Sequence, residues 1–202
     1  MATSVVPFGR PRGERADAAR NRELLLATAR EMIAEHGAAK VTMDGLAERA
    51  GLGKGTVFRR FGSRAGIFRA LLDADERRFQ ERVLSGPPPL GPGADPVDRL
   101  VAYGRARIGF LLDHQDIARA SLDRDRPAAV AADTTHLHVR VLLDRAGVRI
   151  PAIEGVVIQL TAALEAPLLL ALSASEDVPP LEPDVARMLG DGWQYLIERL
   201  VR

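Results

Sequence analysis

The chain has 202 residues, of which 47% are hydrophobic and 4% aromatic, and it contains no cysteine. This composition excludes disulfides and thiolate metal sites and is typical of a helical globular protein that is large enough to bury its own core. The net charge of +1 conceals an asymmetry, because residues 1–70 hold 13 Lys/Arg against 7 Asp/Glu whereas residues 71–202 hold 15 against 20. A basic N-terminal part indicates either contact with nucleic acid at that end or a chance imbalance on solvated faces.

Membrane insertion and secretion are not indicated. The longest apolar run, residues 166–172, is far too short to span a bilayer. The first fifteen residues lack the apolar stretch of a signal peptide. We therefore expect a cytoplasmic protein without a membrane partner.

The first predicted elements are a basic arm and a helix. Residues 1–16 are rich in Arg, Pro and Gly, which favours a disordered segment that either follows the DNA backbone or has no role. A helix is expected over residues 17–36. Its apolar face is formed by residues at helical spacing, ending in a C-terminal histidine: Leu25, Ala29, Met32, Ile33 and His36.

Two short helices joined by a glycine turn are predicted over about residues 43–61. Thr42 is a candidate N-cap of the first helix, and Gly51 can end it in a left-handed conformation. The chain then re-enters a helix at about Lys54. Helices this short are stable only when packed against each other and against a third helix, which the preceding segment supplies.

The outer face of the second short helix carries donors and cations. Lys54, Thr56, Arg59 and Arg60 lie on an element of about two turns, and Gly55 allows a close approach of the backbone to a phosphate. A helix-turn-helix places such a helix in the DNA major groove. The pattern therefore predicts binding to double-stranded DNA.

The rest of the chain is predicted to be helical. A Pro/Gly-rich loop is expected over residues 85–96. Helices are expected at residues 64–84, 96–114, 115–122, 127–146, 152–174 and 184–201. The helix over residues 152–174 is apolar nearly all round, so it must be buried on most sides, and Pro167 should kink it.

The last two predicted helices are the natural surface for a homodimer, because two copies of each would form a four-helix bundle. The alternative is that both helices only complete the core of a monomer. The candidate interface residues are the large side chains of the two helices: Val157, Leu160, Leu164, Leu168, Trp193, Leu196 and Leu200.

No catalytic or cofactor site is predicted. The Gly51–Thr56 segment lacks the Gly-Lys-Ser/Thr order and the preceding strand of a nucleotide-binding loop. His136 and His138 point to different sides of a helix and cannot hold one metal ion from the same face. A small-molecule pocket among the middle helices is predicted instead, with ordinary packing as the alternative for each of its candidate residues: Tyr103, Arg107, Phe110, His114 and His136.

On these motifs, the segment Arg22–Phe68 resembles the N-terminal DNA-binding domain of the TetR/AcrR family of bacterial transcriptional regulators. The resemblance rests on the GLGKGTVFRRF run and on the pattern that precedes it. It implies a DNA-binding domain at residues 1–69 and an effector-binding and dimerisation domain at residues 70–202. It further implies an all-α homodimeric regulator, most often a repressor, which leaves a palindromic operator when a small molecule binds.

The resemblance also suggests roles for single residues. Arg59, Lys54 and Thr56 are the candidates for base contacts. The candidates for contacts that position the helix on the DNA backbone are Thr42, Phe58, Arg60 and Arg64. Phe58 stands where Tyr is frequent in the family, so a hydroxyl that could contact a phosphate is missing.

A second class of function is compatible with the sequence. A helical small-molecule-binding protein or enzyme could carry a vestigial helix-turn-helix. Retardation of DNA by nanomolar protein would favour the regulator, whereas turnover of a ligand without retardation would favour this alternative.

Overall fold

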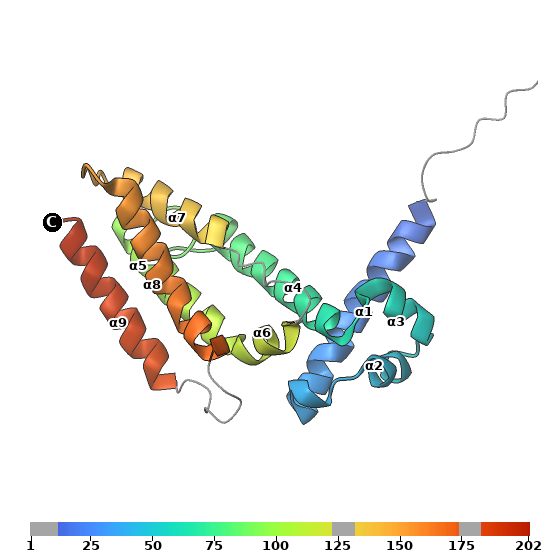
Figure 1. Ribbon diagram of the computed structural model, residues 1–202. Helices are drawn as coiled ribbons and strands as arrows, with labels where there is room; N and C mark the ends of the chain where they lie inside the picture. The colour runs from blue at the N-terminus through green and yellow to red at the C-terminus, as the bar shows by residue number, and fades with distance from the viewer. Residues whose placement is uncertain (1–11, 123–131, 174–182) are drawn as a thin grey trace, which may run out of the picture. The chain divides into compact units, whose positions relative to one another are not determined.

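The computed structural model describes residues 12–122, 132–173 and 183–202, and every regular element within them is helical (Figure 1). The predicted all-α class is therefore confirmed. The elements are α1 (Arg12–His36), the 3-10 helix η1 (Ala38–Lys40), α2 (Met43–Arg49), α3 (Lys54–Phe61), α4 (Arg64–Ser85), α5 (Pro96–Asp113), α6 (Gln115–Ser121), α7 (Ala132–Arg145), α8 (Ile153–Ser173) and α9 (Pro183–Leu200). Most of the predicted arm and the predicted helix start at Pro127 lie outside the described residues.

The chain divides into two compact units, Met1–Ala70 and Leu71–Arg202. The boundary falls within α4, seven residues after that helix begins. The first unit contains α1, η1, α2, α3 and the start of α4. The second contains the remainder of α4 and α5 to α9.

Local signals define the short helices of the first unit. The Thr42 Oγ1 accepts a hydrogen bond from the Gly45 amide at 3.0 Å and caps α2. Gly51 follows α2 with φ 64°, a conformation that glycine adopts without steric cost. The Ser63 Oγ accepts from the Gly66 amide at 3.2 Å at the start of α4. The predicted bounds of α2 and α3 follow from these caps.

The core of the first unit is formed by the inward faces of its four α-helical segments. Because each short helix buries an apolar pair, α2 and α3 are held by packing and not by their own propensity. The fully or nearly fully buried side chains are Leu25, Leu26, Ala29, Met32, Val41, Leu46, Ala47, Val57, Phe61, Ile67 and Phe68.

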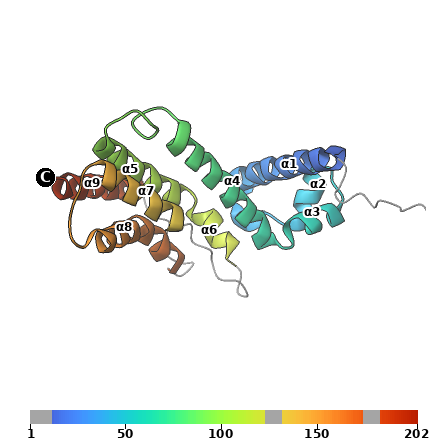
Figure 2. The same ribbon diagram turned by 90° about the horizontal axis from the view of Figure 1, so that it is seen from above.

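In the second unit α5 is the central helix, since it contacts α6, α7, α8 and α9 (Figures 1 and 2). Asp95 caps its start by accepting from the Val97 amide at 2.8 Å, and Pro96 occupies its first turn as predicted. Leu100, Tyr103 and Leu111 of α5 are at most 4% exposed. The core of this unit is thus organised around α5.

The contact between α5 and α9 depends on one small residue. A Cβ built on Gly104 would lie 2.0 Å from the Trp193 Nε1 and 2.2 Å from its Cε2. The indole sits against the α5 backbone, where its Nε1 donates to the Leu100 carbonyl at 2.9 Å. Gly104 is therefore required by the close approach of the two helices.

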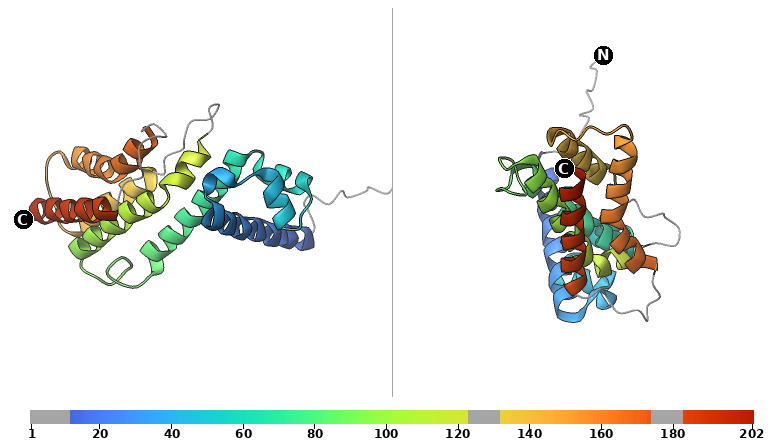
Figure 3. Two further views of the ribbon diagram at one scale, coloured as in Figure 1. Left: turned by 90° about the horizontal axis from the view of Figure 1, so that it is seen from below. Right: turned by 90° about the vertical axis from the view of Figure 1, so that its left-hand side faces the viewer.

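The prediction that α8 is buried on most sides is wrong for the single chain. Ile158 is 58% exposed and Leu169 is 50% exposed, although Val157 and Leu164 on the opposite face are buried. The reason is that α8 packs on α5, α6 and α7 through one face only. Figure 3 shows α8 and α9 at the surface of the second unit.

Candidate nucleic-acid interface and buried polar cluster

The amphipathic pattern of α3 separates an inward face from an outward one. Val57 and Phe61 are buried, whereas Lys54, Gly55, Phe58, Arg59 and Arg60 are exposed and Thr56 is half-buried. No acidic residue lies in the first turn of the helix. The outward face of α3 thus combines cations, a bare backbone position and one aromatic ring.

The cations of this face have different partners. The Lys54 Nζ lies 2.9 Å from the Asp44 carboxylate across the turn, and both side chains are more than 60% exposed. The Arg60 Nη2 donates to the Ala18 carbonyl at 2.8 Å. Among the described residues, the Arg59 guanidinium contacts the Thr56 hydroxyl, and that distance is a long 3.5 Å. Arg59 is therefore the α3 cation with the weakest internal attachment.

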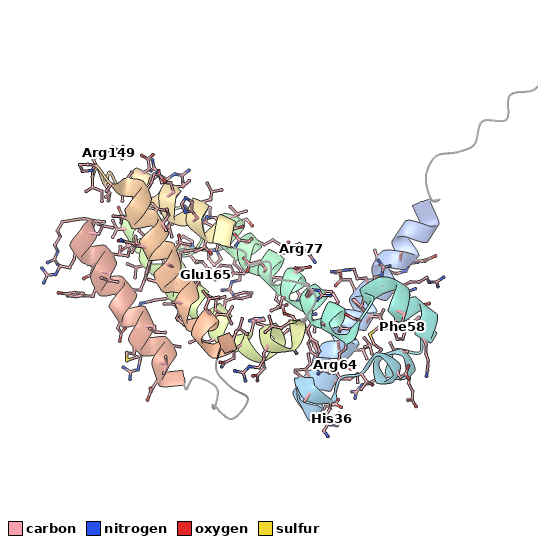
Figure 4. All side chains as sticks on the ribbon, viewed as in Figure 1. His36, Phe58, Arg64, Arg77, Arg149 and Glu165 are labelled. Atoms are coloured by element: carbon pink, nitrogen blue, oxygen red, sulfur yellow. The ribbon has the colours of Figure 1, made fainter. Side chains whose placement is uncertain are left out.

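Arg64 has an internal role that the sequence did not reveal. Its Nε donates to the Val41 carbonyl and its Nη2 to the Ala38 carbonyl, each at 2.7 Å. The guanidinium also lies 4.9 Å from the centre of the Phe68 ring. It therefore ties the segment around η1 to the start of α4, and two of its three nitrogens donate hydrogen bonds within the chain. Figure 4 labels Arg64 at this place in the first unit.

A buried cluster of polar side chains lies within the second unit. Arg107 of α5 is 2% exposed, and its Nη1 is 2.6 Å from the Glu76 carboxylate of α4. Its Nε is 3.0 Å from the carboxylate of Glu165, which is 4% exposed on α8. Thr135 of α7 donates to the same Glu165 oxygen at 2.9 Å. Four helices therefore meet at one charged network inside an apolar core.

The environment of the network raises the pKa of Arg107. Burial lowers the pKa of Arg107, but the charges of Glu165 and Glu76 outweigh that effect and leave the pKa raised. The guanidinium therefore stays charged. One buried cation held by two carboxylates from different helices is a costly arrangement unless its hydrogen bonds are satisfied.

Tyr103 stands one turn before Arg107 and completes the cluster. Burial raises the pKa of its hydroxyl to about 12, and the nearby Thr135 hydroxyl and Arg107 charge lower it in part. The Tyr103 hydroxyl nevertheless lacks a well-aligned hydrogen-bond partner among the described residues. Because buried polar groups are nearly always hydrogen-bonded, this hydroxyl is an exception within the core of the second unit.

The structure brings together four of the five residues predicted for a ligand site. Tyr103, Arg107, Phe110 and His114 follow one another along α5, and the His114 ring stacks on Phe110 with centres 4.3 Å apart. His136 does not join them, since its side chain is 39% exposed and lies 3.9 Å from Glu154.

His138 takes the place expected for His136. Its ring centre is 5.1 Å from that of Tyr103, and its Nε2 is 2.8 Å from the Gln80 amide oxygen. Burial, with Arg99 nearby, lowers the pKa of His138, so the neutral ring is favoured. The periodicity of α7 could not decide which of the two histidines faces inward.

Sequence reasoning also missed Glu76, Thr135 and Glu165. A signal existed for Glu165, because it is the single acid in the middle of the strongly apolar α8. A carboxylate in such a run must either face solvent or find a buried partner. Its partner Arg107 is 58 residues away in the chain, so only the folded structure could identify it.

The residues predicted for a dimer interface lie in two different environments. Val157, Leu160, Leu164 and Trp193 are at most 8% exposed, so they belong to the core of their own chain rather than to an exposed surface. Leu168 and Leu200 are half-buried and Leu196 is 50% exposed. The large apolar side chains exposed on the same helices are Ile158, Leu169, Met188, Tyr195 and Leu196.

The described part of the chain forms neither a membrane span nor a cluster of metal-ligating side chains. No helix there has the length and apolar character needed to cross a membrane. No group of three or more potential metal-ligating side chains gathers within it.

One family model matches a segment at the N-terminal end of the chain. Residues 25–71 match the family model described as bacterial regulatory proteins, tetR family. The match includes the C-terminal half of α1, η1, α2, α3 and the start of α4. A comparison with curated proteins finds no significant match.

Solved structures share the fold over nearly the whole chain. A TetR-family transcriptional regulator from Pectobacterium atrosepticum is 22% identical, with 96% of each chain covered and a TM-score of 0.64. A TetR variant from Acinetobacter baumannii, solved in complex with minocycline, is 20% identical, with 96% of this chain and 99% of that chain covered and a TM-score of 0.55. RolR, solved with resorcinol, is 18% identical, with 93% and 95% covered and a TM-score of 0.55.

Proposed function

We propose that this chain, whose residues 25–71 belong to the tetR family of bacterial regulatory proteins, is a ligand-responsive transcriptional repressor. It binds a palindromic operator as a homodimer and leaves the DNA when a small molecule binds to its second unit. The observation that carries the proposal is the outward face of α3, where Arg59 and Lys54 are presented on a packed helix-turn-helix.

DNA binding is supported by the geometry and charge of the first unit. The N-terminal end of α3 carries no acid, and the whole unit has six more basic than acidic residues. Such a helix fits the major groove, where Arg59 and Lys54 reach base edges or phosphates. Thr42 and Thr56 then add hydroxyl donors beside them, and Arg60 contributes charge toward the DNA backbone.

The proposed homodimer is supported by the small number of base pairs that one short helix can contact. A single recognition helix contacts a few base pairs, and a two-fold axis doubles that number and matches a palindrome with half-sites about 34–36 Å apart. The exposed apolar side chains of α8 and α9, including Ile158, Met188 and Leu196, offer a surface that such a pairing would cover.

Ligand response is supported by the buried polar cluster. Tyr103, Arg107 and Glu165 place a hydroxyl and charges inside an apolar core, and small-molecule sites use a few such polar groups to orient a ligand. A molecule that competes for Arg107 would loosen its ion pair with Glu76 of α4, the helix that begins in the first unit. The ligand shifts the equilibrium only by the difference between its affinities for the two states.

The test is an electrophoretic mobility shift with the full chain and duplex DNA from upstream of its own gene. We expect the DNA to be retarded at nanomolar protein, and the affinity to fall steeply as salt is added. A small molecule that co-purifies with the protein, or that is found by screening for binding to it, should release the DNA. Absence of retardation on this DNA and on duplexes enriched from a random pool would reject DNA binding. Retardation with a flat salt response would reject the electrostatic contacts of α3.

A further inference from the structure

Phe58 is an apolar ring on a surface made of cations. It is 50% exposed, whereas Phe61, three residues later on the same helix, is 9% exposed. Figure 4 shows Phe58 on α3. Leaving half of an aromatic ring in water gives up part of the free energy that its burial would supply. The fold of the first unit does not use this exposed part of the ring.

Gly55 lies one turn before Phe58 on the same side of α3. A Cβ built on Gly55 would meet no atom within 4 Å, and its φ is not positive. Neither crowding nor backbone conformation within the described chain therefore requires glycine there. A glycine in an exposed helical position costs roughly 0.5–1 kcal/mol relative to alanine. The absence of a side chain at Gly55 is explained if an external molecule approaches the helix closely beside Phe58.

The chemistry of the major groove identifies the group that meets this spot. Base edges there present hydrogen-bond donors and acceptors, together with one apolar group, the C5 methyl of thymine. Phe58 has no donor or acceptor, so it gains nothing from a phosphate or a polar base edge. A thymine methyl is the part of the groove that a phenyl ring can bury with a favourable free energy.

We infer that Phe58, with Gly55 one turn before it, reads a thymine in the bound DNA through its C5 methyl group. Gly55 lets the helix come close enough for the ring to cover the methyl, and the neighbouring Arg59 supplies the polar contact. The inference rests on the proposed DNA binding and gives Phe58 a role in specificity rather than in contacts to the DNA backbone.

The experiment removes the methyl group from the DNA and the ring from the protein. Duplexes enriched by the full chain from a random-sequence pool are resynthesised with each thymine replaced, one at a time, by deoxyuridine. Affinities are measured by fluorescence anisotropy at one fixed salt concentration. For the wild-type chain, we expect one thymine position at which deoxyuridine weakens binding about fourfold, the change that one buried methyl group produces.

Three variants locate the effect. Phe58→Ala should bind the thymine and deoxyuridine duplexes equally at that position, whereas Phe58→Tyr, which keeps the ring, should retain the preference. Leu24→Ala removes another exposed apolar side chain of the same unit, 46% exposed on α1, and should keep the full methyl effect. Circular dichroism melting shows whether each variant is folded. If Phe58→Ala does not fold, Phe58→Tyr still tests whether the aromatic ring is sufficient for the methyl preference.

The outcomes separate this inference from the function on which it rests. If no sequence is enriched and no duplex is bound, the proposed DNA binding is wrong. If an enriched duplex is bound but deoxyuridine is neutral at every position, DNA binding stands and the methyl contact is overturned. The contact is also overturned if Phe58→Ala keeps the same loss on removal of the methyl group.

Discussion

Arg59, Arg60 and Arg64 lie within six residues of one another, yet their guanidinium groups have different surroundings. Arg59 is exposed beside Thr56, Arg60 reaches the Ala18 carbonyl, and Arg64 is held by two carbonyls. An arginine with satisfied internal hydrogen bonds stabilises the fold, whereas an exposed one is available to DNA. The two kinds of role are separable by experiment.

Replacing Arg59 tests the role of the exposed arginine in DNA recognition. Arg59→Ala should cost about 1–3 kcal/mol of binding free energy on the cognate duplex if Arg59 reads a guanine. Binding is measured by anisotropy on cognate and random duplexes. An equal loss on both would show that Arg59 contacts only phosphate. Thermal stability should be unchanged, because the side chain has no short internal hydrogen bond among the described residues.

Replacing Arg64 tests the opposite role. Arg64→Ala takes the part-buried Arg64 donor from the Val41 carbonyl and leaves the Ala38 carbonyl with the Val41 amide alone, so we expect a loss of about 1–3 kcal/mol in the free energy of unfolding of the first unit. Chemical denaturation followed by circular dichroism measures it. The slope of affinity against salt should stay as in the wild type. Unchanged stability with a shallower salt slope would instead make Arg64 a phosphate contact.

His138 makes stability depend on pH. Burial holds its pKa below the ordinary value of 6.5, with Arg99 and Arg107 acting in the same direction and Glu76 against it. Between the folded and unfolded pKa values the unfolded chain binds more protons, so stability falls as the pH decreases below about 6.5. His138→Gln should make the decline in melting temperature between pH 7 and pH 5 shallower. Identical pH profiles for both proteins would contradict this.

At the scale of elements, the second unit is organised by what α5 presents on its different faces. Arg107 is paired with Glu76 of α4 and Glu165 of α8, the Tyr103 ring lies against His138 of α7, and Gly104 makes room for the Trp193 ring of α9. Gly104, which has no side chain, and the charged Arg107 are three residues apart on α5. A substitution in α5 therefore produces a packing clash on the face that meets α9, or an unpaired buried charge on the face that carries Arg107.

The packing of α5 against α9 is tested by two glycines of the same helix. In Gly104→Ala the new Cβ would overlap the Trp193 indole, and over-packing of this kind costs about 1–3 kcal/mol of stability. Gly109→Ala is the matched control, because its Cβ would meet no atom within 4 Å and alanine favours a helix. Thermal melts should show a large loss for the first variant and none for the second. Similar melting temperatures would mean that α9 does not pack here.

At the scale of the whole molecule, charge and apolar surface are distributed unevenly. Basic residues are in excess in residues 1–70 and acidic ones in residues 71–202. The exposed apolar residues of α8 and α9 belong to the acidic part. This division is expected if one part of the chain meets DNA and the other meets a second copy of itself.

The pairing of two copies is tested at Leu196, which is 50% exposed on α9. Leu196→Asp should convert a dimer into a monomer in sedimentation velocity at micromolar protein, because a charge would be buried at the interface. Leu84→Asp, at a residue 63% exposed on α4, is the control and should remain dimeric. A wild-type monomer, or equal behaviour of both variants, would reject the proposed α8 and α9 interface.

The two short helices and the outward face of α3 could be predicted from the amino-acid sequence alone. Their signals are local: the cap at Thr42, the glycine turn at Gly51 and the apolar spacing of Val57 and Phe61 all act within a few residues. The outward position of Arg59 follows from the same spacing. The all-α class and the bounds of α2 and α3 were therefore predictable.

Which side chains meet across the fold could not be predicted from the sequence. Arg107 finds Glu165 58 residues away, and Trp193 reaches the Leu100 carbonyl 93 residues away. The tertiary structure also decided that His138 and not His136 faces the cluster, and that Arg64 holds the chain around η1. Helical periodicity gives the faces of one helix, but the partner of each face depends on how the helices pack, and no local pattern encodes that packing.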